Sequence, residues 1–272
     1  MIIFIVCLKK TNLSGLNFDE LFFMKNILIS DHKTGHTLSR LYTRILNKYL
    51  KNELEFRYCY LFWNFYNQDE KYIIFIRDPR EIIISGYLHH KRCNETTEIW
   101  ANRINGDYYE NWNIHHFLQK EMKKNFKYLN IGKHFSIPMP YKTKLNMLSQ
   151  EEGIIYEMHS VAKLTITGMY NLIHYGKKNV ITIDLDDLTF NFNSSIEKIC
   201  KFLDIEKSFS EEIRKYLLEH NTLNLKKKDK LPYHTTNIDL QPKRYKKYWT
   251  KEIQKEFEKL FPKDILSKFN FA

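Results

Sequence analysis

Two nearly continuous apolar runs stand out in the first eighty residues, each followed directly by a polar turn. They cover residues 25–30 (KNILIS) and 72–76 (YIIFI). Short apolar runs of this kind are typical of strands buried on both faces of a parallel sheet. Two further strands are predicted at 53–62, where polar and apolar residues alternate, and at 180–184 (VITID).

Helical periodicity fills the segments between these strands. Apolar side chains recur at helical spacing over 37–50. Pro79 suits the first turn of a helix that Asp78 caps and that continues over 81–90. A long helix is predicted from Ser149 to Tyr175. Shorter predicted helices cover 97–100, 194–203, 209–220 and 250–260, whereas 101–141 is irregular. Strands that alternate with helices indicate an α/β fold with a parallel sheet.

The composition is that of a globular protein with a basic surface. The 272 residues include 43% apolar residues, which suits a single domain, predicted here over 24–272. Residues 1–23 are interpreted as an extension or the product of a mis-assigned start codon. The apolar run at 1–8 is too short to cross a bilayer, which takes about 20 residues.

Charge and cysteine content bear on the possible partners and on the cellular compartment, but they do not decide the function. The net charge of +11 favours polyanionic partners such as a nucleotide cofactor, an acidic glycan or nucleic acid, but equally suits a lysine-rich solvated surface. The four cysteines are scattered and show no zinc-binding spacing. Free thiols indicate a reducing compartment, so we expect a soluble cytoplasmic protein.

Residues 32–37 (HKTGHT) carry the clearest chemical signal. They lie between the first predicted strand and the first predicted helix, and they contain Lys33 and Gly35. Backbone N–H groups at a helix start, together with the helix dipole, favour an anion there, and a lysine adds a positive charge. The order is not that of a Walker A motif, in which the lysine follows the second glycine.

This loop resembles the 5'-phosphosulfate loop of sulfotransferases that use 3'-phosphoadenosine 5'-phosphosulfate (PAPS). A second segment strengthens the likeness, because Arg77 ends a strand and Ser85 follows eight residues later, as in that family's 3'-phosphate element. A third match is the acidic stretch at 184–188 (DLDDL) after the fourth predicted strand. The resemblance covers 25–205 in order and implies a three-layer α/β/α, P-loop-like fold with a central parallel sheet.

The resemblance also implies roles for individual residues. The 5' end of PAPS would be held at the loop, Lys33 would neutralise charge on the bridging oxygen, and Arg244 is a candidate for a lid over the 3'-phosphate. No metal is required. The residues implied to bind PAPS are Lys33, Thr34, Gly35, His36, Thr37, Arg77, Ser85 and Arg244. His36 departs from the family, where Thr or Ser is usual, and either adds a positive charge or packs outward.

The general base is not identified by the resemblance. Many members place a histidine before the arginine segment, but no histidine occurs between 37 and 88 here. His89, which lies one turn past Ser85, is the first candidate and Glu55 the second. Residues 91–148 are expected to shape the pocket of a small-molecule or glycan acceptor, whose identity and hydroxyl or amine group the sequence does not specify.

Two other functions stay open at the sequence level. A P-loop-like kinase of a small metabolite would use Thr34 after Lys33 to hold Mg²⁺, although the glycine order argues against it. A non-enzymatic nucleic-acid-binding protein would account for the charge and the 15% aromatic residues, but no motif of that class is visible.

Overall fold

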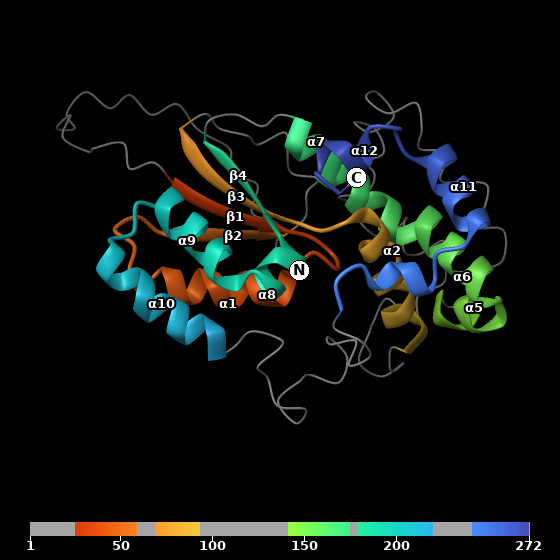
Figure 1. The fold of residues 1–272 in the computed structure, drawn as a ribbon, viewed down its shortest axis with the longest axis horizontal. Helices are drawn as coiled ribbons and strands as arrows, with labels where there is room; N and C mark the ends of the chain where they lie inside the picture. Colours follow the sequence, from red (N-terminus) through yellow and green to blue (C-terminus); the bar gives the residue numbers. More distant parts are fainter. Residues whose placement is uncertain (1–24, 59–68, 93–140, 175–178, 220–240, 272) are drawn as a thin grey trace, which may run out of the picture.

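The computed structural model describes residues 25–58, 69–92, 141–174, 179–219 and 241–271. Within these ranges, four parallel strands form one sheet in the order β2-β1-β3-β4 (Figure 1). The strands are β1 (Lys25–Ser30), β2 (Leu54–Tyr58), β3 (Glu70–Ile76) and β4 (Val180–Asp184). β1 and β3, the strands that precede the two candidate phosphate-binding segments, are direct neighbours. The predicted parallel sheet is therefore confirmed.

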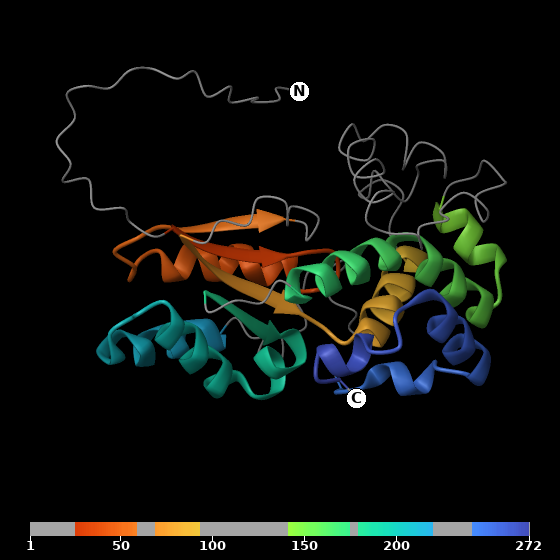
Figure 2. The same ribbon diagram turned by 90° about the horizontal axis from the view of Figure 1, so that it is seen from above.

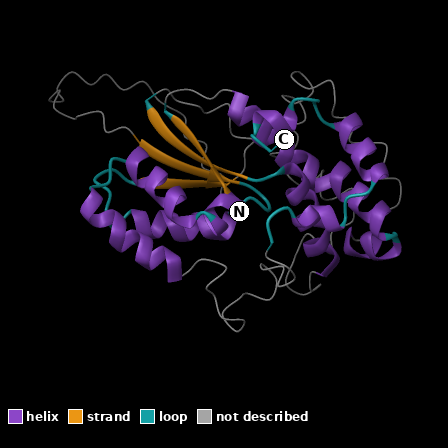
Figure 3. Ribbon diagram, in the orientation of Figure 1, coloured by secondary structure: helices purple, strands orange, loops and turns teal. Residues whose placement is uncertain are grey.

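Side chains that alternate along the strands build two separate cores. Ile27 and Ile74 belong to the core on one face, whereas Leu28, Ile73 and Phe75 belong to the core on the other face. Both faces are covered, which explains why β1 and β3 read as continuous apolar runs. The molecule therefore has the three layers implied by its resemblance, with helices on each side of the sheet (Figure 3).

Among the described residues, four helices cover the face that carries Leu28 and Phe75. They are α1 (His36–Leu46), α8 (Leu185–Phe190), α9 (Phe192–Phe202) and α10 (Lys207–Glu219). α1 ends earlier than the predicted 37–50, because the side chain of Asn47 bonds to both backbone groups of Leu54 and turns the chain into β2. The predicted helices 194–203 and 209–220 are confirmed with small shifts as α9 and α10.

The second group of helices packs on the other face and extends beyond the carboxyl ends of the strands, as Figure 2 shows from above. These elements are α2 (Pro79–Arg92), α5 (Tyr141–Met147), α6 (Gln150–Glu157), η3 (Met158–Ala162), α7 (Lys163–His174), η4 (Arg244–Lys247), α11 (Lys251–Leu260) and α12 (Ile265–Lys268). None of the helices in the described ranges combines the length and apolarity needed to cross a membrane.

Local signals at two helix starts are confirmed. The Asp78 carboxylate accepts the backbone N–H of Arg80 at 2.8 Å and begins α2. Ser149 and Glu152 form a reciprocal capping box at the start of α6. The predicted long helix 149–175 exists as α6 and α7, but a π-helical segment at Met158–Ala162 interrupts it. The predicted helix 97–100 and the irregular stretch 101–141 lie almost wholly outside the described residues.

The single domain expected over 24–272 stays a prediction. Residues 1–23 lie outside the described ranges, as do most of the residues expected to shape an acceptor pocket.

Candidate functional site

The loop after β1 is a tight turn held by its own polar groups. The Thr34 hydroxyl accepts the N–H of Asp31 at 2.7 Å and donates to the carbonyl of Asp31 at 3.0 Å. The Asp31 carboxylate accepts the N–H of His32 at 2.6 Å. Lys33 adopts a left-handed conformation with φ of 61°, which is uncommon for a residue other than glycine. These bonds set the path of the backbone before α1 begins.

Gly35 is required at the junction between the loop and α1. Its φ is +96°, and a Cβ placed there would lie 3.0 Å from a Leu185 methyl and 3.3 Å from the Phe75 ring. Gly35 is also the N-cap of α1, where no side chain caps the N–H groups of the first turn. A helix start of this kind presents N–H donors and a positive dipole end to an anion.

We expect the Gly35→Ala variant to be less stable than the wild type by about 1–3 kcal/mol, because a left-handed backbone strains an L-residue and the added methyl crowds Leu185. Urea denaturation measures the free energy of unfolding. Lys215→Ala, at an exposed position of α10, is the control and should change it little. Equal stability of the two variants would contradict the strained turn.

The loop residues differ in what they can offer a ligand. Lys33 is half-buried and Thr37 is exposed on the first turn of α1. Thr34 is fully buried, and because Asp31 engages its hydroxyl, a direct phosphate contact from that side chain does not fit the structure. His36 packs on Phe56 of β2, with 5.3 Å between ring centroids, which favours the packing interpretation over a charge contact.

Arg77 links the end of β3 to the loop. Its Nη1 donates to the carbonyl of Lys33 at 3.4 Å. Its Nε lies 3.5 Å from a carboxylate oxygen of Asp186, and its Nη2 lies 3.7 Å from Glu81. The guanidinium therefore stands beside the loop at 32–37, at the shared carboxyl edge of β1 and β3.

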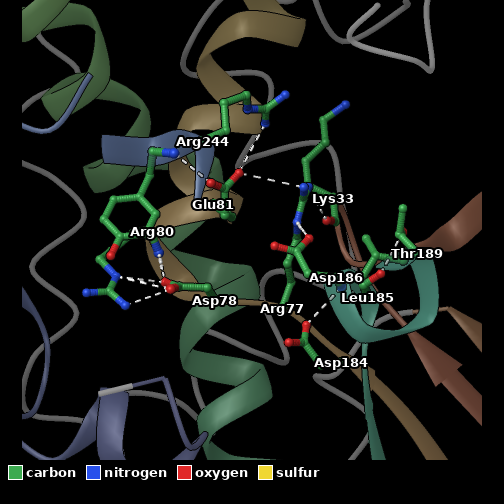
Figure 4. A network of polar contacts seen from close by, with 11 residues as sticks. Lys33, Arg77, Asp78, Arg80, Glu81, Asp184, Leu185, Asp186, Thr189 and Arg244 are labelled. Atoms are coloured by element: carbon green, nitrogen blue, oxygen red, sulfur yellow. Dashed lines mark hydrogen bonds and ion pairs between the residues drawn. The ribbon is translucent and has the colours of Figure 1, made fainter. Parts of the chain in front are cut away.

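The Glu81 carboxylate lies between the guanidinium groups of Arg77 and Arg244. Arg244 follows Glu81 by 163 residues in the sequence. One oxygen of the buried carboxylate lies 3.3 Å from Arg244, and the other accepts the N–H of Tyr245 at 2.6 Å. Figure 4 shows Arg77 and Arg244 reaching this carboxylate from different elements. Burial raises the pKa of Glu81, while Arg77 and Arg244 oppose that rise. Burial, together with Arg77, lowers the pKa of Arg244. Two guanidinium groups are thus held close together by one carboxylate.

Arg80 fastens the surrounding backbone. It forms a two-pronged pair with Asp78, its Nη2 donates to the carbonyl of Phe271 at 2.7 Å, and its guanidinium lies 4.3 Å from the centre of the Tyr245 ring. The start of α2, the η4 turn and the C-terminal segment are therefore tied together. The Arg244 guanidinium itself is held by Glu81 rather than by Arg80.

The acidic stretch after β4 faces the same place. The Asp184 carboxylate caps α8 by accepting the N–H of Asp186 at 3.1 Å. Burial and the nearby carboxylate of Asp186 raise the pKa of Asp184 to about 7. Figure 4 shows Asp184 and Asp186 close to the Arg77 side chain.

Ser85 and His89 continue one face of α2. Residues 81, 85 and 89 are spaced by four, so they follow one another along the helix. Both Ser85 and His89 are buried, and the His89 ring lies 6.1 Å from the ring of His32 in the loop. His89 therefore lies close to the loop. Ser85 lies one helical turn after Glu81 on the same face of α2.

Glu55 does not join this group. It lies on the edge strand β2, opposite Ile27 in the register, three residues before the end of the strand. Its side chain is exposed and makes a two-pronged bond with Arg57, which lowers the pKa of Glu55. A carboxylate with a lowered pKa, away from the carboxyl edge, is a poor candidate for a general base.

The structure places five residues at or beside the site to which the sequence assigned no individual role: His32, Glu81, Glu157, Asp186 and His90. His32 and Asp186 lie within the segments 32–37 and 184–188 that the sequence pattern had singled out. Glu81 carried a usable signal, since it follows Arg77 by four residues, in the first turn of the helix that Pro79 begins. Glu157 carried none, because nothing in its local sequence distinguishes it from other helix carboxylates.

Comparison with protein families decides the class. The family model described as "Sulfotransferase domain" matches residues 56–271. The chain belongs to the sulfotransferase family. That family membership makes it a transferase of sulfuryl groups, and the match contains Arg77, Ser85 and Arg244. The loop at 32–37 precedes the matched residues, so its assignment depends on the sequence pattern and on the structure. No curated protein matches the chain.

In the described part of this sulfotransferase, no group of three or more His, Cys, Asp or Glu side chains is arranged to hold a metal ion.

Proposed function

We propose that this sulfotransferase takes its sulfuryl group from PAPS and passes it to a hydroxyl or amine of an acceptor. The observation that carries the proposal is the contact between Arg77 and the carbonyl of Lys33. It joins two cationic sites, one at the start of α1 and one formed by Arg77 and Arg244. PAPS carries a 5'-phosphosulfate and a 3'-phosphate, so it needs two such sites in one groove.

The residues present fit this donor. Gly35 is the N-cap of α1 and has no capping side chain, so the N–H groups of the first turn can donate to a phosphate. Arg77 and Arg244 present planar guanidinium groups, which suit the oxygens of a phosphate. When bound, PAPS supplies a sulfuryl group that is already activated by its bond to phosphate.

The roles of the residues follow from their positions. Backbone N–H groups from Gly35 to Thr37 bind the 5' end, and Lys33 stabilises negative charge that develops on the leaving oxygen. Arg77, Ser85 and Arg244 bind the 3'-phosphate, and Glu81 keeps the two arginines in place before the ligand arrives. Catalysis then comes mainly from positioning and charge stabilisation, as in phosphoryl transfer.

The structure also bears on the kinase alternative. A P-loop-like kinase would need the Thr34 hydroxyl for a magnesium ion, but that hydroxyl both accepts from and donates to Asp31. The turn would have to open before Thr34 could take that role. This supports PAPS over ATP as the nucleotide.

We expect PAP, the desulfonated product of PAPS, to raise the thermal unfolding temperature by several degrees. A ligand at a hundred times its dissociation constant stabilises the folded state by about 2.7 kcal/mol. The same measurement with ATP and Mg²⁺ should show little change. Stabilisation by ATP with Mg²⁺ but not by PAP would favour the kinase, and stabilisation by RNA alone would favour a nucleic-acid-binding protein.

A further inference from the structure

Three side chains outside the two cationic sites form a hydrogen-bonded chain that runs from the core to the loop. Glu157, at the end of α6, lies 2.6 Å from His90 Nδ1 on α2. His90 Nε2 in turn lies 2.9 Å from Nε2 of His32, whose ring plane differs from that of His90 by 17°. The side chains of Glu157 and His90 are 0% exposed. This series of hydrogen bonds ends at His32, the residue that directly precedes Lys33.

The surrounding structure is shaped to admit Glu157 at this position. A Cβ on Gly86 would come within 2.9 Å of the Glu157 carboxylate carbon, so the closest turn of α2 has no side chain there. The π-helical segment Met158–Ala162 begins at the next residue, and Ser160 inside it departs from helical geometry. π-helical turns occur often at functional sites. A buried carboxylate is costly unless hydrogen bonds satisfy it, and His90 provides one.

We propose that His32 is the general base that accepts the proton of the acceptor, and that His90 and Glu157 hold it in the tautomer this needs. An ionised Glu157 accepts the Nδ1–H of His90. The Nε2 lone pair of His90 then accepts the Nε2–H of His32, which leaves the basic lone pair of His32 on Nδ1. This inference rests on the proposed function and names the proton acceptor of the same reaction.

The proton and electron pairs balance in this scheme. The O–H bond of the acceptor breaks as its oxygen forms a bond to sulfur, and the proton bonds to Nδ1 of His32. The bond between sulfur and the donor's bridging oxygen breaks, and its electron pair stays on the phosphate. The Nε2 proton of His32 can pass to His90, so the positive charge moves beside Glu157 and away from Lys33.

The electrostatic setting keeps both imidazoles neutral. Burial lowers the pKa of His32 and of His90 well below the ordinary value, and the charge of Lys33 lowers both further. The titratable groups that face His32 are Lys33, His36, His89 and His90, with Glu157 behind His90. A neutral imidazole can accept a proton at pH 7. An anionic donor beside the loop would raise the pKa of His32 and make it a stronger base.

The first test needs no catalysis. Nitrogen-15 NMR of the imidazoles in the full-length protein, without nucleotide, reports which ring nitrogen of each histidine carries a proton. We expect His90 to be protonated on Nδ1 and His32 on Nε2, and we expect Glu157→Gln to alter the His90 signals. Protonation of His90 on Nε2 alone, or an unperturbed titration of His32 near pH 6.5, would overturn the relay.

The second test separates a base from a structural residue. His32→Gln keeps a donor for His90 but has no basic nitrogen, so we expect kcat to fall by about 10²- to 10⁴-fold with little change in PAP affinity. The fall in wild-type kcat/KM on acidification below pH 6.5 should disappear in this variant. Glu157→Gln should lower kcat by at least about tenfold, because a histidine in the wrong tautomer is a poor base.

A matched control is available close by. His159, on the π-helical segment, pairs with Glu256 at 2.9 Å and lies outside the site. His159→Gln removes a comparable histidine–carboxylate pair and should leave kcat unchanged. If the fall in kcat/KM at low pH disappears in His89→Gln but remains in His32→Gln, the base is His89 and the proposal is wrong. If wild-type protein does not bind PAP, the proposed function fails, while the NMR result still decides whether the relay exists.

Discussion

Replacing Lys33 by alanine is expected to lower kcat by on the order of 10³-fold while the protein remains folded. The loss follows from removing a positive charge placed where the leaving oxygen gains negative charge, and single stabilising groups of this kind contribute about 10²- to 10³-fold. The fold should survive, because the turn is held by Thr34 and Asp31 and by the conformation of Gly35.

Steady-state kinetics with PAPS and a set of hydroxyl and amine acceptors measures this effect, and circular dichroism with urea denaturation checks the fold. Lys255→Ala is the control, since that lysine is 64% exposed on α11 and far from the loop in sequence. Wild-type turnover by Lys33→Ala would rule out the proposed mechanism, whatever the effect on KM.

Arg77→Gln is expected to weaken PAP binding by about 10- to 150-fold, which corresponds to about 1.5–3 kcal/mol for hydrogen bonds to a charged group. Arg77 contributes the guanidinium that stands between the loop and the candidate 3'-phosphate site. The Glu81 carboxylate keeps Arg244 and the N–H of Tyr245 as partners in the variant, so it is not left as an isolated buried charge.

The neighbouring Arg80 supplies a matched contrast. It binds Asp78 and the Phe271 carbonyl, so Arg80→Gln should lower the free energy of unfolding without changing the PAP affinity of the folded protein. Isothermal titration with PAP and urea denaturation of both variants separate the two roles. Unchanged PAP affinity in Arg77→Gln would remove Arg77 from the binding site.

The strands and several helix starts could be predicted closely because their causes are local. The run at 72–76 lies within β3 (Glu70–Ile76), since a strand buried on both faces must be apolar throughout. Ser149 and Asp78 begin their helices by side-chain bonds to N–H groups two or three residues ahead. Such signals need no knowledge of the rest of the chain.

Helix ends and interruptions were predicted less well. α1 ends at Leu46 rather than at residue 50, because Asn47 bonds to a strand seven residues later. The π-helical segment within 149–175 has no marker such as proline, and both it and α6 pack against α2. In both cases tertiary packing outweighs the local helical pattern.

The sequence by itself determined the parallel α/β fold, the turn at Gly35 that we propose binds an anion, and the place of Arg77 just after a neighbouring strand. Each depends on apolar periodicity or on residue order at a strand end, and the carboxyl ends of parallel strands meet at one edge. Only the tertiary structure decided that Arg244 meets Glu81, and that Glu157 reaches His32 through His90. The physical reason is that burial and partners 58 or more residues away set the chemistry of these groups, and both arise only when the helices pack.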